Sequence, residues 1–135
     1  MANLLENNIT GKISAQKYLC TISWRNGNFV MDEPESIAGK DLGPDPYTTL
    51  LAALAGCTLS TLRMYIDRKG WDIPEIHISL NLSQENNPDL ITTMTREITF
   101  SKTIDEEIKN RLLVIAEKCP VSKILKNTIL INTTI

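Results

Sequence analysis

One segment near the middle of the chain restricts the fold more than any other. Residues 46–69 have the pattern of a single long helix. Asp45 offers a side-chain acceptor at the N-cap position, and Pro46 suits the first turn because its missing N–H would have been unpaired anyway. Two basic residues fall in the last turn, where they complement the helix dipole, and Gly70 follows as a left-handed stop. The sequence therefore predicts a helix that is unusually long for a chain of 135 residues.

The two halves of this helix differ in character. The first half contains LLAALAGC at Leu50–Cys57 and is apolar nearly all round, whereas the charged residues gather in the second half. An apolar surface of this width must be buried on several sides. Gly56 costs about 1 kcal/mol relative to alanine inside a helix, so we expect something to approach closely there. A chain of this size offers little to cover such a helix, and we predict a homodimer.

Alternation and capping signals predict the remaining elements. Strands are predicted at residues 17–24, 28–31, 75–83, 90–101 and 128–134, helices at 104–118 and 120–126, and a loop at 32–43. Asn26-Gly27 predicts a hairpin turn between the first two strands, and Thr103 is the expected cap of the helix at 104–118. His77 alternates with apolar residues and should face solvent. This order is that of an α+β fold, and we expect one domain over residues 1–135.

Composition excludes several classes of partner. The chain has 14 Lys and Arg against 16 Asp and Glu, so it lacks the broad basic face that nucleic acid or anionic lipid would need. The longest apolar run has eight residues, far short of the roughly 20 that span a membrane. The opening MANLLENNIT does not read as a secretion signal. We therefore expect a cytoplasmic protein that binds neither nucleic acid nor membrane.

The cysteine and histidine content limits the chemistry further. Three cysteines without close spacing argue against a disulfide framework and suit a reducing compartment. One histidine and no CxxC or HExxH motif leave little from which to build a metal site. The sequence also has no glycine-rich phosphate loop, so no cofactor is predicted.

Each cysteine has two possible roles on the sequence alone. Cys57 is either a small buried hydrophobe or a reactive thiol, and it lies too far from the helix start for the helix dipole to stabilise its thiolate. A cation from elsewhere would be needed. Cys119 precedes Pro120 and either fills a corner or caps the following short helix, where unpaired N–H groups favour a thiolate. Cys20 shares a strand face with Trp24, which favours a role in core packing over a role as a reactive thiol.

The sequence predicts that the arginines lie on the surface. Arg25 precedes the hairpin turn, and strict alternation places it opposite Trp24, so it reaches a site only if the turn re-aims its side chain. Arg63, Arg68 and Arg96 are expected to be surface charges.

Three motifs together resemble the OsmC/Ohr family, which comprises osmotically inducible protein C and organic hydroperoxide resistance proteins. These motifs are GPDPYTTLLAALAGC, TLRMYIDRKG and LLVIAEKCPVSKIL, and the resemblance covers most of the chain from about Lys17 onward. The two motifs that contain cysteine are jointly more specific than either alone. The resemblance implies an OsmC-like fold, with antiparallel sheets packed around a long central helix in an intertwined homodimer.

The resemblance also implies an activity. Enzymes of this family are thiol peroxidases (peroxiredoxin-like oxidoreductases) that reduce organic hydroperoxides in the oxidative stress response. By similarity, Cys57 would be the peroxidatic thiolate, Cys119 the resolving thiol, and Arg25 the arginine that holds the thiolate. A thiolate attacks the peroxide, becomes a sulfenic acid and condenses with the second thiol. A dithiol, typically of the lipoyl type in this family, then restores both cysteines.

One position departs from the family pattern. Peroxidase members carry Glu just after the proline that opens the long helix, and here Tyr47 stands there. Asp45 or Glu35 could supply the missing carboxylate, and Asp45 and Tyr47 are candidate residues of the substrate pocket. The departure also motivates an alternative, a non-catalytic member that uses the same pocket to bind a small apolar or thiol-bearing ligand. A third reading is a structural dimer whose cysteines only pack.

Overall fold

The computed structural model describes all 135 residues as an α+β protein, in agreement with the predicted class. Its contacts divide the chain into two compact units, Met1–Leu50 and Leu51–Ile135. The first unit contains β1 (Thr10–Ile13), β2 (Cys20–Trp24), β3 (Gly27–Met31) and the short 3-10 helix η1 (Glu35–Ile37). α1 (Pro46–Lys69) begins at the end of the first unit. The second unit continues with β4 (Ile76–Asn86), β5 (Leu90–Phe100), α2 (Glu106–Glu117) and α3 (Pro120–Leu125).

The first unit is a three-stranded antiparallel sheet in the order β1-β2-β3. Trp24 pairs with Gly27, so the hairpin turn is formed by Arg25 and Asn26, one residue earlier than predicted. Gly27 is required for a different reason, because a Cβ there would lie 2.6 Å from the Trp24 ring. β2 begins at Cys20 rather than at residue 17. β1 was not predicted, since its four exposed residues show no alternation of apolar and polar side chains.

The loop that follows β3 is organised by one buried carboxylate. Asp32 accepts hydrogen bonds from the backbone N–H groups of Tyr18 (3.2 Å), Glu33 (2.8 Å), Lys40 (3.3 Å) and Leu42 (3.2 Å). Burial raises the pKa of Asp32, but these four hydrogen bonds outweigh it and lower the pKa below its usual 3.8. The aperiodic segment is therefore held by a charged group rather than by regular structure.

α1 has the predicted bounds and caps. The Asp45 carboxylate accepts a hydrogen bond from the Thr48 N–H at 3.3 Å, and Gly70 ends the helix with φ +70°. The expectation of close approach at Gly56 is wrong for the single chain, because nothing lies within 4 Å of a Cβ built there. The apolar first half is also not buried all round, since Leu50 is 40% exposed. Length and composition alone would allow α1 to cross a membrane, a property that core helices of soluble proteins share.

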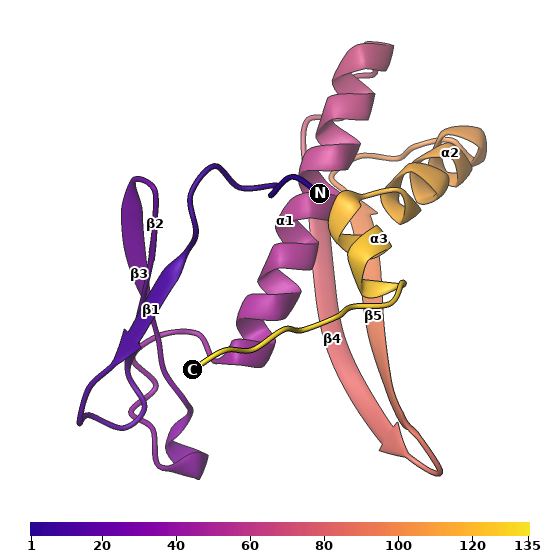
Figure 1. Cartoon of the computed structure of the whole chain (residues 1–135). Helices are drawn as coiled ribbons and strands as arrows, with labels where there is room; N and C mark the ends of the chain where they lie inside the picture. Colours follow the sequence, from indigo (N-terminus) through magenta and orange to yellow (C-terminus); the bar gives the residue numbers. More distant parts are fainter. The chain divides into compact units, whose positions relative to one another are not determined.

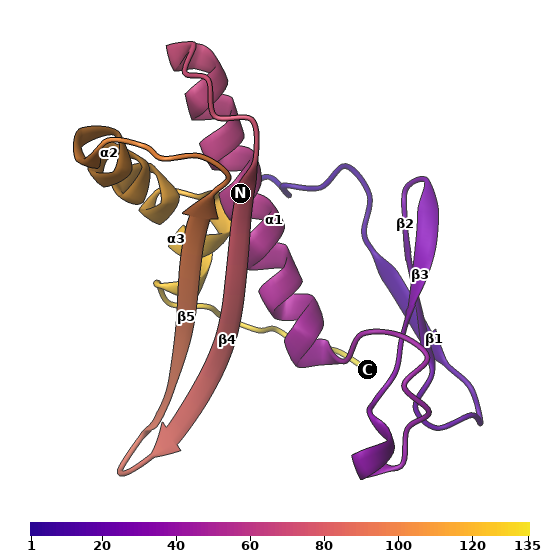
Figure 2. The ribbon, with the colours of Figure 1, turned by 180° about the vertical axis from the view of Figure 1, so that it is seen from behind.

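The second unit has a long hairpin beside α1 (Figures 1 and 2). β4 and β5 pair antiparallel along their whole lengths, from Ile76 opposite Phe100 to Asn86 opposite Leu90. The predicted alternation is confirmed, because every second residue from Ile76 to Leu82 is half-buried and the residues between are exposed. His77 lies on the exposed side, as predicted.

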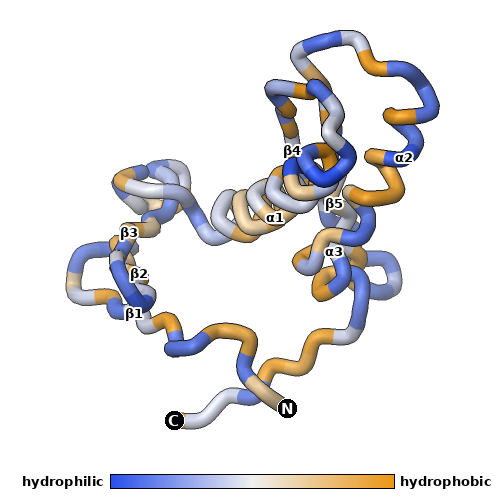
Figure 3. Tube along the Cα trace, turned by 90° about the horizontal axis from the view of Figure 1, so that it is seen from above, coloured by the Kyte–Doolittle hydropathy of each residue, from blue (hydrophilic) through white to orange (hydrophobic).

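Two predictions for the second unit are wrong. One concerns the cap of α2, and the other concerns a strand at residues 128–134. α2 is capped by Asp105, which accepts a hydrogen bond from the Ile108 N–H at 2.9 Å, and not by Thr103. The helix starts later than expected because Ile104 is buried in the core ahead of the cap. Residues 128–134 form no strand, although the segment that leads to the C-terminus includes a hydrophobic stretch, coloured orange in Figure 3. A composition rich in β-branched residues is insufficient there, since no strand of the chain pairs with them.

One hydrophobic core stabilises the second unit. It joins the C-terminal half of α1 to α2, and the hairpin strands pack against it through half-buried side chains. Its buried members are Leu62, Tyr65, Ile66, Ile73, Ile104, Leu112, Ile115 and Ala116. This core fixes α1 relative to the corner between α2 and α3, where Cys119 lies.

Candidate functional site

The second unit brings two of the predicted site residues into one cluster. Cys57 lies half-buried on α1, and Cys119 is fully buried at the corner between α2 and α3. The Val121 N–H, two residues beyond Cys119, donates a hydrogen bond to the Cys57 sulfur at 3.5 Å. Both thiols are free. The fold therefore places cysteines from distant parts of the sequence in the same environment.

Cys119 is the N-cap residue of α3. Its Sγ atom accepts a hydrogen bond from the Ser122 N–H at 3.3 Å, and the Ser122 hydroxyl lies 3.0 Å away. Pro120 occupies the first helical position, where a missing N–H has no cost. The Thr58 hydroxyl on α1 lies 3.7 Å from the same sulfur. Of the two roles considered for Cys119, the structure shows the cap.

Arg96 is the charged residue of this cluster. Its Nη1 atom donates hydrogen bonds to the hydroxyl oxygens of Thr58 (2.8 Å) and Ser122 (2.9 Å), and lies 4.0 Å from the Cys119 sulfur. Its Nη2 atom pairs with Glu117 at 3.4 Å. The side chain is only 11% exposed, so the prediction that Arg96 is a surface charge is wrong.

A sequence signal for Arg96 exists in the alternation of β5. Met94, Arg96, Ile98 and Phe100 are the half-buried positions of this strand, and the residues between them are exposed. An arginine in register with apolar residues on an alternating strand faces inward, where it needs polar partners. Thr58 and Ser122 were missed because a single hydroxyl residue in a helix gives no comparable signal.

The surroundings of Cys119 favour its thiolate. Burial raises the pKa of Cys119, but hydrogen bonds with the Ser122 hydroxyl and N–H, and with the side chains of Thr58 and Cys57, outweigh it. The balance lowers the pKa of Cys119 to about 7. The hydrogen bonds around Cys119 therefore favour its thiolate relative to that of a free cysteine.

The other predicted site residues lie in the first unit. Arg25 is exposed at the turn between β2 and β3, and Tyr47 is 59% exposed on the first turn of α1. The carboxylate of Asp45 accepts hydrogen bonds from both the N–H and the hydroxyl of Thr48. Cys20 is half-buried and its thiol donates to the Tyr18 carbonyl at 3.6 Å. The roles of Arg25, Asp45 and Tyr47 at the site remain predictions.

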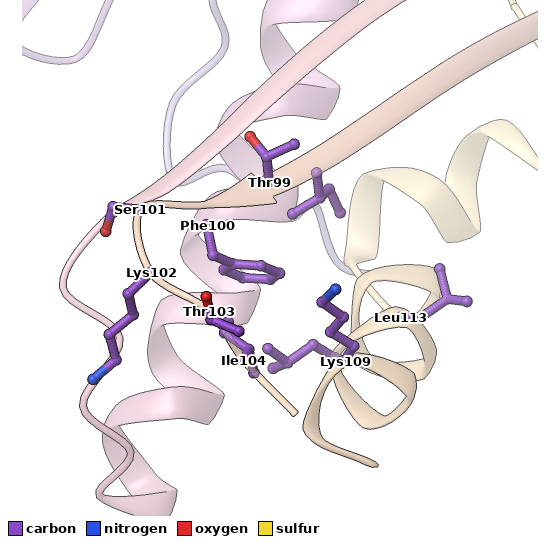
Figure 4. A pocket seen from close by; sticks show the side chains of 10 residues that line it. Thr99, Phe100, Ser101, Lys102, Thr103, Ile104, Lys109 and Leu113 are labelled. Atoms are coloured by element: carbon purple, nitrogen blue, oxygen red, sulfur yellow. The ribbon is translucent and has the colours of Figure 1, made fainter. Parts of the chain in front are cut away.

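A separate cavity of about 610 Å³ lies where β5 leads into α2 (Figure 4). Phe100, Ile104 and Leu112 contribute apolar side chains to its lining, together with Lys102 and Lys109. The two lysines are already paired with carboxylates, those of Asp72 and Glu106 respectively. No cysteine lines this cavity, so thiol chemistry has no place in it.

The family model for OsmC-like protein matches residues 39–134, well over half of the chain. The chain belongs to the OsmC-like protein family. The match includes both cysteines of the cluster, whereas Arg25 lies outside it. No curated protein matches the chain.

Solved structures share the fold over about nine-tenths of the chain. The OsmC-like protein of Mycoplasma pneumoniae is 22% identical with a TM-score of 0.70, covering 92% of this chain and 89% of that one. The organic hydroperoxide resistance protein OhrB of Bacillus subtilis is 21% identical with a TM-score of 0.65, covering 92% and 93%. The organic hydroperoxide resistance protein OsmC of Legionella pneumophila is 15% identical with a TM-score of 0.68, covering 90% of each. The predicted OsmC-like α+β fold, with antiparallel sheets and a long helix, is confirmed.

Proposed function

We propose that this OsmC-like protein is a thiol peroxidase that reduces organic hydroperoxides through a Cys57/Cys119 thiol–disulfide cycle. The observation that supports it most is the shared cluster of the two cysteines, with Cys57 partly exposed and Cys119 buried among hydrogen-bond donors. Two proteins of similar fold are named organic hydroperoxide resistance proteins. We also propose a cytoplasmic location, because the cycle needs a compartment that keeps thiols reduced.

The proposed cycle oxidises and reduces the two sulfurs in turn. The Cys57 thiolate attacks the outer oxygen of the hydroperoxide, the O–O bond breaks, and the alkoxide takes a proton and leaves as an alcohol. Cys57 is then a sulfenic acid. The Cys119 thiolate attacks the Cys57 sulfur, the S–O bond breaks, and hydroxide takes a proton and leaves as water. A dithiol of the lipoyl type reduces the disulfide and is itself oxidised to a disulfide.

The first-unit residues have supporting roles in this proposal. Arg25 would stabilise the Cys57 thiolate, as its counterpart in the family motif does, and Tyr47 and Asp45 would line the substrate pocket. Because Tyr47 replaces the usual carboxylate, Arg25 would be held without a paired acid at that position. These roles come from the family resemblance and from the positions in the sequence.

The product of each half-reaction gives a direct test. One equivalent of cumene hydroperoxide should convert the protein to a Cys57–Cys119 disulfide with the loss of two thiols, measured by thiol counting and peptide mass spectrometry. Cys119→Ser should stop at the sulfenic acid of Cys57, captured as a dimedone adduct. Cys20→Ser is the matched control and should behave as the parent. Unchanged thiols in the parent would contradict the peroxidase and favour the ligand-binding alternative.

We also propose that the protein is a homodimer. The C-terminal segment supports this, because Ile129, Leu130 and Ile131 are 52%, 82% and 85% exposed and pair with no strand of their own chain. Apolar side chains in a strand-like pattern are normally covered by a partner. Light scattering at micromolar concentration should give a mass of about 30 kDa, twice the 15.1 kDa of one chain. A mass near that of the single chain would contradict the dimer.

A further inference from the structure

Arg96 contacts both hydroxyl groups that lie beside Cys119. Its Nη1 atom donates to the hydroxyl oxygen of Thr58 on α1 and to that of Ser122 on α3, at 2.8 and 2.9 Å. Its Nη2 atom pairs with Glu117 at the end of α2. One β5 side chain therefore joins three helices at the point where the buried thiol lies.

The number of protons on each hydroxyl restricts the direction of the hydrogen bonds. A serine hydroxyl has one proton to donate and two lone pairs. The Ser122 oxygen already accepts from Arg96, and the Cys119 sulfur lies 3.0 Å from it, so the proton is free to point at the sulfur. The Thr58 oxygen also accepts from Arg96, but the single Thr58 proton is donated to the Leu54 carbonyl at 2.7 Å and not to the sulfur, which lies 3.7 Å away. With Arg96 in place, the hydroxyl and the N–H of Ser122 can both donate to the Cys119 sulfur.

Other charged groups around this sulfur are few. Glu117 faces Arg96 rather than the thiol, and its second oxygen is paired with Lys126. Cys57 is the remaining titratable neighbour of Cys119. The guanidinium, 4.0 Å from Cys119 Sγ, is thus the nearest positive charge among these groups.

We propose that Arg96 is a positioning residue for Cys119, which orients the Ser122 proton toward the sulfur and makes Cys119 the leaving group when a reductant opens the Cys57–Cys119 disulfide. The proposal rests on the peroxidase cycle proposed above for the opening step. The orientation of the Ser122 proton toward Cys119 is independent of that cycle, and it can be tested without peroxide.

This proposal defines which sulfur is attacked and which one leaves when the disulfide is reduced. The thiolate of the dithiol attacks the Cys57 sulfur, which is the more exposed of the two, and the S–S bond breaks with its electron pair going to Cys119. A lower pKa of the departing thiol makes it leave faster. The second thiol of the reductant then attacks its own mixed disulfide and releases Cys57 as a thiolate. The dithiol is oxidised to a disulfide and both protein cysteines are reduced.

The hydrogen-bond donors around the Cys119 sulfur determine the direction in which its pKa shifts. Because they stabilise the anion, they lower the pKa of Cys119 to about 7, and the thiolate dominates above that pH. Without Arg96 the Ser122 hydroxyl proton is free to turn away from the sulfur, so burial prevails and the pKa of Cys119 rises. A rise of one unit reduces the thiolate fraction at pH 7 about fivefold.

Ultraviolet thiolate absorbance measures this shift without requiring a reagent to reach the buried sulfur. Cys119 becomes the sole thiol in a Cys20→Ser/Cys57→Ser background, since the chain has three cysteines. Arg96→Gln should move the titration midpoint upward by about one unit or more, and Arg96→Lys should retain part of the effect. Arg63→Gln is the matched control, because Arg63 lies on the surface of α1 in an ion pair with Asp67, and its midpoint should not move. An unmoved midpoint in folded Arg96→Gln would overturn the proposal.

Ser122→Ala provides a second test that does not depend on the folding of Arg96→Gln. It removes the donor that Arg96 orients and leaves the charge in place, so its midpoint should also rise. A midpoint equal to that of the single-thiol parent would overturn the proposal whatever Arg96→Gln does.

The disulfide equilibrium separates this inference from the proposed function. In the chain with all three cysteines, the constant for reduction by dithiothreitol at about pH 8 should fall about fivefold in Arg96→Gln, because the reduced state loses thiolate stabilisation. An unchanged constant would contradict the leaving-group role. If peroxide forms no disulfide in the parent, the peroxidase proposal fails, while the single-thiol titration still decides whether Arg96 controls Cys119.

Discussion

Replacement of Cys57 by serine should lower the rate of cumene hydroperoxide consumption at least about 1,000-fold, because the variant lacks the sulfur that attacks the O–O bond in the proposed cycle. A serine hydroxyl at this place is not ionised at neutral pH and is a far weaker nucleophile. The half-buried position of Cys57 gives peroxide access that the fully buried Cys119 lacks. The measurement is peroxide loss with dihydrolipoamide as the reductant.

The other two cysteines provide the comparison for this variant. Cys20→Ser should keep the parental rate, because Cys20 lies in the first unit and its thiol donates to a nearby backbone carbonyl. Cys119→Ser should react once with peroxide and then turn over slowly, since the sulfenic acid of Cys57 has no partner thiol. Undiminished consumption by Cys57→Ser would exclude this residue as the peroxidatic cysteine. Equal losses in all three variants would indicate misfolding, which far-ultraviolet circular dichroism detects.

Much of the second unit could be predicted because its signals are local. Asp45 and Gly70 marked the two ends of α1, and alternation predicted the inward face of β4. The failures are at places where a distant group decides. Residues 128–134 are rich in the β-branched residues typical of a strand, but strand formation needs a partner that the chain does not supply.

The candidate site was predicted in part for the same reason. The resemblance singled out Cys57 and Cys119, and the sequence allowed Cys119 to be a helix cap before Pro120. Arg96 was assigned to the surface because it was weighed as a single charge and not as a member of the half-buried face of β5. The hydroxyl of Ser122 contacts Arg96 of β5 only when α3 is folded against that strand. Propensity describes neighbours in sequence, whereas a polar cluster depends on neighbours in space.

Truncation of Leu62 to alanine should destabilise the second unit by about 2–5 kcal/mol. Leu62 is fully buried in the core that joins α1 to α2, so the smaller side chain leaves a cavity in addition to the lost burial. Met64→Ala is the matched control on the same helix, because Met64 is 71% exposed and its loss should change the stability by no more than about 0.5 kcal/mol. Urea denaturation in a Trp24→Phe background measures both, since Trp71 packs against this core.

The outcome bears on the site as well as on the fold. Leu62 lies one helical turn beyond Thr58, whose hydroxyl contacts both Arg96 and Cys119. At protein concentrations held equal, a variant that loses several kcal/mol should also open this turn more often and expose Cys119 to alkylation faster. If Leu62→Ala is no less stable than Met64→Ala, the core does not fix α1 against α2 as described. If stability falls but Cys119 remains protected, the thiol cluster is held by its hydrogen bonds independently of the core beneath it.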